Sequence, residues 1–435
     1  MSKIDSSIVN ISLPVISKDF NITTSEASWI IISYLLILTC TMMLFGKLYD
    51  MVNTKRFFIA GYIVFIAGSL LCGLSINLRM LVISRVVQAL GGAVLNIGAY
   101  VMVSRFLPEN RFGWAFGILT AVNAIGVSIG APIGGFITVH LSWQWIFFIN
   151  IPIGLAAILQ VLKSIPNETA HTKNPIKIDY AGAILSMLAL LSLLIALNLG
   201  DELGWFSLPI ILLFLGFAVF AFIFIVIEKQ SPDPLVHLSF FRDKGFLFTL
   251  SATVTALMIL SGTSFLMPFY LESIMGLTAD KVGLFILVYT GVFAVVSSLL
   301  AGRLSDKIVP ARICAAAISS AAFASLFFSF TLSLSGYIFI IIFFVWLGTS
   351  LGFFMPSNNN QVMRHAKPET EGEISGLLST SVNLSFTFGV CIFETIYSHS
   401  NNILHGFRNA FIFGFIACTA AMFLSFASIK SKSSR

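Results

Sequence analysis

Charged side chains are scarce in this sequence, and their scarcity excludes an ordinary soluble protein. Only 10% of the 435 residues are Asp, Glu, Lys or Arg, whereas 57% are hydrophobic and the mean hydropathy is +0.95. Soluble domains carry about 25% charged residues. Seven stretches have no charged residue over about 20 positions, the length a helix needs to cross a bilayer. They are Ala27–Phe45, Phe57–Asn77, Tyr180–Gly200, Leu203–Ile227, Gly245–Leu271, Val282–Gly302 and Asn409–Ile429.

Motifs of catalysis, metal binding and nucleotide binding are also missing. The sequence contains no Walker loop and no H-E-x-x-H motif, so we expect neither an enzyme nor an ATP-driven pump. The five cysteines lie in apolar stretches without metal-ligand spacing, and their odd number argues against a disulfide framework. We therefore expect no metal site and no cofactor. A membrane-embedded enzyme or sensor is the alternative that these absences disfavour.

Lysine and arginine are distributed unevenly between the loops, which predicts the orientation of the chain. If both termini lie in the cytoplasm, 19 basic residues fall in inward loops and the C-terminal tail, and 4 in outward loops. The net charge of +6 therefore indicates contact with membrane lipid and not with nucleic acid. The apolar pattern predicts fourteen spans, the first one short: 6–17, 26–46, 57–76, 79–103, 113–138, 144–163, 179–199, 206–228, 245–270, 282–302, 313–332, 336–356, 374–398 and 407–429.

One short motif occurs twice, after the second span of each half of the chain. Gly46–Arg56 and Gly302–Arg312 both read G-x-L-x-D followed by basic residues. Glycine allows two helices to approach closely at such a turn. We expect Asp50 and Asp306 to accept backbone hydrogen bonds at the N-terminus of the next helix, where the dipole favours negative charge. The basic residues, among them Arg56, would pair with them or with anionic lipid; an ordinary charged loop is the alternative.

The duplicated motif also predicts the domain organisation. Two homologous six-helix bundles would occupy residues 1–164 and 241–435, the second with a short basic tail. Residues 165–240 would form an inserted helix pair with its cytoplasmic linkers. Parallel repeats of this kind are the architecture of major facilitator transporters.

Four further motifs carry a resemblance to one branch of these transporters. They are Asp5–Pro14, Arg85–Ala93, Gly126–Gly135 and Trp143–Gly154, the last being the most specific match. Over nearly its whole length the chain resembles the fourteen-span drug:proton antiporters of the major facilitator superfamily, which include bacterial multidrug and quaternary-ammonium efflux pumps. The resemblance implies an all-α polytopic membrane protein with the major facilitator fold, located in the bacterial cytoplasmic (inner) membrane.

The chain departs from the family pattern at several positions. Ala89 stands for a common Gly, Gln144 for a common Arg and Asn53 for the Gly of the turn. Pro132 lies one position later than usual, and none of these departures removes a charged centre. Only four residues precede Asp5, so the first span would fall short of the cytoplasmic interface. We therefore expect the true start codon to lie upstream, or the chain to be clipped.

The resemblance implies proton coupling at two ionisable residues inside spans. Asp5 is the expected proton carrier, near mid-membrane and facing a central cavity. Arg85 is the one basic residue well inside a span, where an arginine costs about 2.5–3.5 kcal/mol, so we expect it to face a partner or a cavity. The alternatives are a helix-capping or lipid-edge Asp5, and a structural Arg85 that is bonded to carbonyls and Gln88.

Other polar groups inside spans are candidates for substrate binding. Glu394, near the outer end of the thirteenth span, resembles an acidic residue that assists recognition of divalent cations in the family. A solvated interfacial glutamate is the alternative. The full candidate set is Asp5, Asn10, Gln88, Asn123, Asn383 and Glu394.

A glycine stripe in the fifth span is the candidate gating element. Gly126, Gly130 and Gly134 recur every four residues, with Pro132 between them, and such small faces allow close helix packing in lipid. The resemblance implies that this face meets the second bundle and moves against it during transport. Close packing without any gating role is the alternative.

Together these features predict a secondary transporter driven by the proton gradient. It would export lipophilic, cationic drugs or toxic compounds by alternating access, as a monomer in membrane lipid, with a periplasmic adaptor and outer-membrane channel as further candidate partners. Export or import of an endogenous metabolite on the same scaffold is one alternative. An inactive truncated paralogue is another, and the substrate itself is not specified by the sequence because multidrug pockets are adaptable.

Overall fold

The computed structural model describes residues 2–166, 179–277, 279–286, 288, 291–332, 336–400 and 402–433. Within these ranges the regular elements are sixteen α-helices and two short 3-10 helices, without a strand. The predicted all-α class is therefore confirmed for the described chain. Residues 167–178 of the predicted inserted segment lie outside the described residues.

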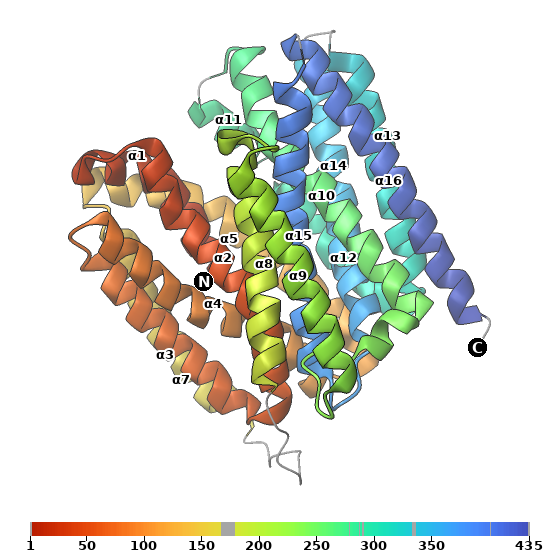
Figure 1. Cartoon of the computed structure of the whole chain (residues 1–435). Coiled ribbons are helices and arrows are strands. Elements are labelled where there is room, and N and C mark those ends of the chain that lie inside the picture. The colour runs from red at the N-terminus through yellow and green to blue at the C-terminus, as the bar shows by residue number, and fades with distance from the viewer. Residues whose placement is uncertain are drawn as a thin grey trace.

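The N-terminal half forms one group of packed helices. Helix α4 packs against α2 and α3, α1 packs against α5, and α3 packs against α7. Figure 1 shows this half in red to yellow, beside the green to blue C-terminal half. Its helices are α1 (Ser2–Phe20), α2 (Thr24–Met51), α3 (Thr54–Gly73), α4 (Leu78–Phe106), α5 (Phe112–His140), α6 (Trp145–Phe148) and α7 (Asn150–Ser164).

The remaining helices form a second group and a separate pair. Helices α8 (Tyr180–Leu203) and α9 (Leu208–Gln230) pack mainly against each other. In the second group α10 packs against α15 and α16, and α13 against α14 and α16. Its helices are α10 (Lys244–Ser273), α11 (Ala279–Ile286), α12 (Val292–Lys307), α13 (Pro310–Thr331), α14 (Tyr337–Met363), α15 (Glu371–Ser398) and α16 (Ile403–Ser433).

Polar residues between the apolar runs determine where several helices begin. The side chains of Asn53 and Asn77 accept hydrogen bonds from backbone N–H groups in the first turns of α3 and α4. Thr23 and Glu26 form a reciprocal capping box at the start of α2. Asn53 has φ −61°, so this position needs a cap and not the left-handed backbone of a turn glycine.

Twelve described helices are long and apolar enough to span a membrane, fewer than the fourteen predicted. The first difference is α1, whose 19 residues include Lys3, Asp5, Lys18 and Asp19. The second is the predicted span 282–302, which coincides with two shorter helices, α11 of 8 residues and α12 of 16. The count of fourteen is therefore not confirmed.

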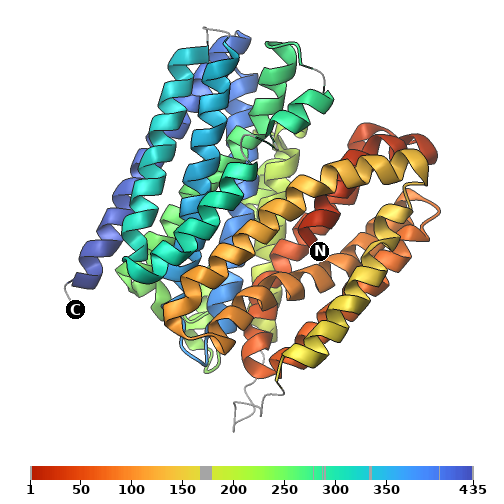
Figure 2. The ribbon, with the colours of Figure 1, turned by 180° about the vertical axis from the view of Figure 1, so that it is seen from behind.

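Helices α2 and α5 make most of the contacts of the N-terminal group with the C-terminal group. Helix α2 packs against α15, and α5 packs against α12 and α14. Figure 2 shows α5, in orange, crossing beside the teal and blue helices of the C-terminal half, and in both views the halves converge toward the lower end. Asp50 and Asp306 lie where α2 and α12 end, and we call this end of the molecule the motif end.

Candidate functional site

The carboxylate of Asp5 is the centre of a buried polar network. Its Oδ2 lies 2.7 Å from Nη1 of Arg85, and its Oδ1 accepts hydrogen bonds from the side-chain amides of Gln88 (3.0 Å) and Asn150 (2.7 Å). Asp5 is 1% exposed, and Arg85 and Gln88 are 0% exposed. The network therefore excludes a lipid-edge position for Asp5, and it brings together three predicted residues from α1 and α4.

Arg85 has further partners that surround its guanidinium. Nε donates to the carbonyl of Ile30 (3.2 Å), and Nη1 also donates to Gln88 Oε1 (2.5 Å). The guanidinium carbon lies 4.1 Å from the ring centroid of Tyr34 and 5.7 Å from that of Phe147, which is cation–π geometry. Burial of such a pair is costly unless further hydrogen bonds satisfy its groups, and Ile30, Gln88 and Asn150 supply such bonds here.

The network corrects the predicted position of Asp5. The carboxylate lies inside the N-terminal group of helices and does not form the wall of an open cavity. The reason is its partners: Gln88 also donates to Ser69 of α3 (2.8 Å), so Asp5 is bonded to a cluster drawn from α1, α3, α4 and α7. The predicted partner for Arg85 is present, and the carbonyl and Gln88 contacts of the structural alternative are present as well.

Asn150 is a site residue that the sequence analysis did not single out. It is the first residue of α7, directly after the short helix α6, and it is 2% exposed. A signal was available, because Asn150 is a polar residue inside the apolar motif Trp143–Gly154. Ile149, between the two helices, keeps helical backbone (φ −60°, ψ −26°), so α6 and α7 run on as nearly one helix that carries the amide of Asn150 to Asp5.

The other substrate-binding candidates do not join this network. Asn10 is exposed on α1, and Asn123 is half-buried on α5. Asn383 of α15 places its amide 3.1 Å from the sulfur of Met42 on α2, at the contact between the two halves. Glu394 is half-buried farther along α15 and interacts electrostatically with Asp201 of α8.

The first G-x-L-x-D motif connects the two halves of the molecule. Asp50 accepts hydrogen bonds from the backbone N–H groups of Gly372 (2.7 Å) and Glu373 (2.9 Å), at the start of α15. Gly46 packs directly on the backbone of Gly372 and Gly376, without room for a Cβ atom. The motif therefore caps a helix of the opposite half, and the prediction that Asp50 caps the next helix is wrong.

The second motif makes the equivalent contact. Asp306 accepts hydrogen bonds from the backbone N–H groups of Gly113 (2.7 Å) and Trp114 (2.8 Å), at the start of α5. A Cβ atom on Gly302 would lie 2.6 Å from the carbonyl oxygen of Gly113. Both carboxylates thus sit at the positive N-terminal end of a helix from the other half.

Arg105, which sequence analysis did not select, is the basic partner of the first motif. Its Nε lies 2.8 Å from Glu371 of α15 and its Nη2 lies 3.5 Å from Asp50, while Nη1 donates to Thr54 (2.6 Å). The predicted partner Arg56 is exposed instead. No local pattern identifies Arg105, because it lies at the end of α4, about fifty positions after the motif whose aspartate it contacts.

The glycine stripe of α5 packs inside the N-terminal half. Cβ atoms on Gly126, Gly130 and Gly134 would meet Ile4, Ser7 and Ile8 of α1, and Pro132 is exposed. The prediction that this face meets the second bundle is therefore wrong. The close approach between halves uses the other end of the same helix, where Gly113 and Gly117 contact Gly302.

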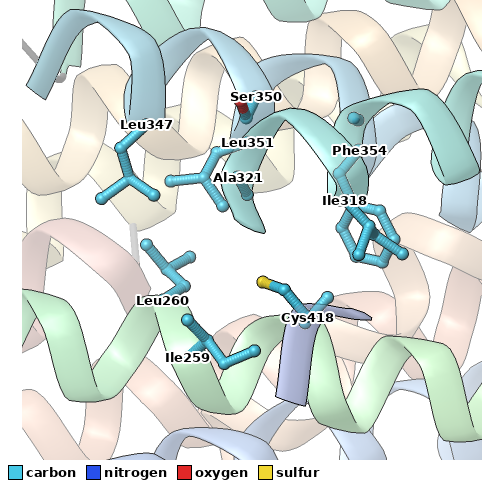
Figure 3. A pocket seen from close by; sticks show the side chains of 11 residues that line it. Ile259, Leu260, Ile318, Ala321, Leu347, Ser350, Leu351, Phe354 and Cys418 are labelled. Carbon is cyan, nitrogen blue, oxygen red and sulfur yellow. The ribbon is translucent and has the colours of Figure 1, made fainter. Parts of the chain in front are cut away.

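The described chain also contains a small pocket in the C-terminal half. It has a volume of about 20 Å³ and lies between α10, α13, α14 and α16, lined by aliphatic side chains with Phe354, Cys418 and Ser350 (Figure 3). The Ser350 hydroxyl already has two hydrogen-bond partners, the Trp346 carbonyl (2.9 Å) and the Ser320 hydroxyl (3.0 Å). A pocket of this volume has room for about one water molecule and is too small to be a substrate site.

Comparison with known proteins gives a consistent family. A family model described as Major Facilitator Superfamily matches residues 1–390. The riboflavin transporter RibZ of Clostridioides difficile is 32% identical over 401 residues, which cover 92% of this chain and 86% of RibZ. Multidrug resistance protein 3 of Bacillus subtilis is 28% identical over 405 residues, covering 92% of this chain and 77% of that protein.

Solved structures agree on the fold. The human organic anion transporter MFSD10 has a TM-score of 0.71 at 12% identity, covering 98% of this chain and 96% of its own. The proton:xylose symporter XylE has a TM-score of 0.69 at 12% identity, covering 98% and 92%. The family match, the relatives and the fold together show that the chain belongs to the Major Facilitator Superfamily and is a multi-pass membrane transporter, not an enzyme.

Proposed function

We propose that this protein is a proton-coupled exporter that works by alternating access, with Asp5 as the proton carrier. The observation that carries the proposal is the buried pair of Asp5 and Arg85, bonded to Gln88 and Asn150. An ion pair in a membrane interior is a functional-site hypothesis by default. Within the described residues, it is also the place where Asp5, Arg85 and Gln88, three of the predicted polar residues, meet.

The pair couples protonation to rearrangement. If a proton binds Asp5, Arg85 loses its counter-ion while it remains fully buried. Removing one partner of a buried pair costs about 3–5 kcal/mol. That cost falls only if helices move or water enters around Arg85, so a proton on Asp5 favours a second conformation of the N-terminal half.

The orientation of the cycle comes from the basic loops. The motif end carries most of the Lys and Arg residues, so we propose that it faces the cytoplasm, with both termini on that side. Both Asp50 and Asp306 bond across the halves here, which supports a conformation closed to the cytoplasm. Opening toward the cytoplasm requires these contacts to break.

Lipophilic cations are the substrate class we propose. Support comes from the multidrug resistance proteins among the relatives, and from the acidic groups Glu394 and Asp201 between α15 and α8. The riboflavin transporter, 32% identical over most of the chain, favours a second candidate, a flat heterocyclic metabolite. The two candidates differ in charge and are separable by direct comparison of one cation with riboflavin.

The finer assignment follows from the same features. We propose membership of the fourteen-span drug:proton antiporters, counting α1 as one span and α11 with α12 as another. A bacterial inner-membrane location, action as a monomer, and a periplasmic adaptor with an outer-membrane channel as partners belong to the same proposal. The proton gradient would be the only energy source.

The test is substrate-induced proton release from purified protein in weakly buffered detergent. Tetraphenylphosphonium should release protons near neutral pH, and Asp5→Asn should reduce that release at least tenfold because the titrating carboxylate is gone. Asp19→Asn is the matched control, since Asp19 is also on α1 and accepts a hydrogen bond from Trp143 but is exposed. Full release in Asp5→Asn would overturn the assignment of the carrier. Release by riboflavin alone would favour the second candidate.

A further inference from the structure

The inserted helix pair packs over the interface between α2 and α15. Helix α8 contacts both of these helices. Leu190 and Leu194 of α8 form one buried cluster with Leu36 and Cys40 of α2, and Leu384 of α15 packs against it. The α5–α12 interface has no such covering pair among the described helices. The pair is therefore placed to sense, or to resist, separation of α2 from α15.

The linker that leaves this pair is anchored to the protein. It runs from 231 to 243, between α9 and α10, and Figure 1 shows it in green at the lower end of the molecule. Leu235 and Val236 are 1% and 3% exposed. The backbone N–H of Val236 donates to the buried carboxylate of Glu228, at the end of α9 (3.3 Å). The linker is thus packed against the rest of the protein at these two residues.

The next linker residue binds the helix that Asp50 caps. The backbone N–H of His237 donates to Oε1 of Glu373 (2.5 Å), and its ring Nδ1 lies 2.8 Å from Oε2. Glu373 is 2% exposed, and its own backbone N–H donates to Asp50. Glu373 therefore contacts both segments: its backbone N–H binds Asp50 of α2, and its side chain binds the linker at His237.

We propose that the His237–Glu373 contact makes the inserted helix pair part of the closure at the motif end, and that cytoplasmic protons strengthen this closure. His237 is then a positioning residue, acting on the gate through Glu373. The proposal goes beyond the transport cycle above, because it needs only that α2 and α15 separate. It does not depend on Asp5 or on the identity of the substrate.

The charges around His237 support the direction of the effect. Its pKa is raised above the ordinary value, chiefly by the hydrogen bond to Glu373, with smaller help from the charges of Glu373 and Glu228. Partial burial and Lys47 of α2 oppose the rise. Asp50 is the other charged group facing Glu373, and beyond it lies the Arg105–Glu371 pair.

The sign of the pH dependence follows from linkage. A histidine with a raised pKa contributes its full stabilisation below the ordinary pKa, near 6.5, and loses it as pH rises through the raised value. Neutral His237 can still donate through Nδ1–H, but without the charge that makes the contact about twice as strong. The α2–α15 interface should therefore open more readily as cytoplasmic pH rises. The side chain is 41% exposed, so salt will screen part of the effect.

The experiment measures separation of α2 from α15 in the full-length protein without substrate. Spin labels at Val52→Cys and Glu369→Cys, both exposed positions, report the distance by electron–electron resonance after the native cysteines are replaced. The open fraction in the parent should rise at least threefold from pH 5.5 to 8.5. His237→Gln should show the parent's pH 8.5 open fraction at every pH, and His237→Arg should keep the pH 5.5 fraction because its charge does not titrate.

Controls separate this gate effect from misfolding and from the proton carrier. His365→Gln is the matched control, because His365 follows the end of α14 on the same side of the molecule and its ring bonds to the carbonyl of Gln361 in that helix; it should keep the parental response. A second label pair, Asn110→Cys with Lys307→Cys, should show the α5–α12 distance unchanged in His237→Gln. A full pH response in His237→Gln, or its loss in Asp5→Asn, would overturn the proposal.

Discussion

At both interfaces between the halves, an aspartate of one half caps the N-terminus of a helix from the other half. At α2–α15, Asp50 caps a helix through Gly372 and Glu373; at α5–α12, Asp306 does so through Gly113 and Trp114, at nearly the same distances. In both, glycines bring the helices into backbone contact. The two copies of the sequence motif therefore have the same structural role, which is to cap a helix of the opposite half.

The side chains at the two interfaces are different. Glu371 and Glu373 flank Gly372, while Phe112 and Trp114 stand at the corresponding positions beside Gly113. The first pair binds Arg105 and His237, whereas Phe112 is buried in apolar surroundings. The same closure is thus reinforced by charge on one side and by apolar packing on the other, which predicts that pH and salt act more strongly on the α2–α15 interface.

The largest effect should come from breaking backbone contact at either interface. Gly46→Val and Gly302→Val each place a side chain against backbone of the opposite half, and overpacking costs about 1–3 kcal/mol or more. Each variant should shift its own interface at least tenfold toward the open state in the distance measurement above. Gly135→Val is the control, since a Cβ there meets nothing within 4 Å. An unchanged distance in Gly46→Val would contradict the packing described here.

Neutralising the capping carboxylates should have the next largest effect. Asp50→Asn and Asp306→Asn each lose two charge-assisted hydrogen bonds, worth about 1.5–3 kcal/mol apiece before compensation. Asp50→Asn should open its interface more, because Arg105 also loses one of its two acidic neighbours. The two label pairs measure both openings. Equal opening would show that Arg105 adds nothing to the first interface.

Sequence analysis predicts the features that depend on local pattern. Apolar runs predict the helices, the duplicated motif predicts two equivalent turns, and Asp5 and Arg85 are conspicuous because they are charged groups in apolar surroundings. Their direct pairing follows from a physical requirement, since a buried arginine needs a counter-charge. The predicted count of fourteen spans exceeds the twelve candidate spans of the described chain, because α1 is polar and because α11 and α12 occupy one predicted span.

The partners of the motifs are beyond local pattern. Gly372 lies 322 positions after Asp50, and a cap on the next helix would use the same residue types. The stripe of Gly126, Gly130 and Gly134 likewise predicts a close neighbour without specifying which helix it is. Arg105 and His237 carry no pattern of their own. Their roles arise only when distant segments meet at the start of α15.

The smallest effect should distinguish the charged interface from the apolar one by salt. Glu371→Gln keeps the shape of the side chain but removes the charge facing Arg105, both side chains being about 10% exposed. Both side chains are mostly buried, but Arg105 keeps Asp50 and Thr54 as partners, so we expect a loss of about 1–3 kcal/mol. In the parent, raising salt from 0.05 to roughly 1 M, where the screening length falls to about 3 Å, should open α2–α15 more than α5–α12. In Glu371→Gln most of that salt response should be gone. A salt response of equal size at both interfaces would show that the charges at the start of α15 do not set the difference between them.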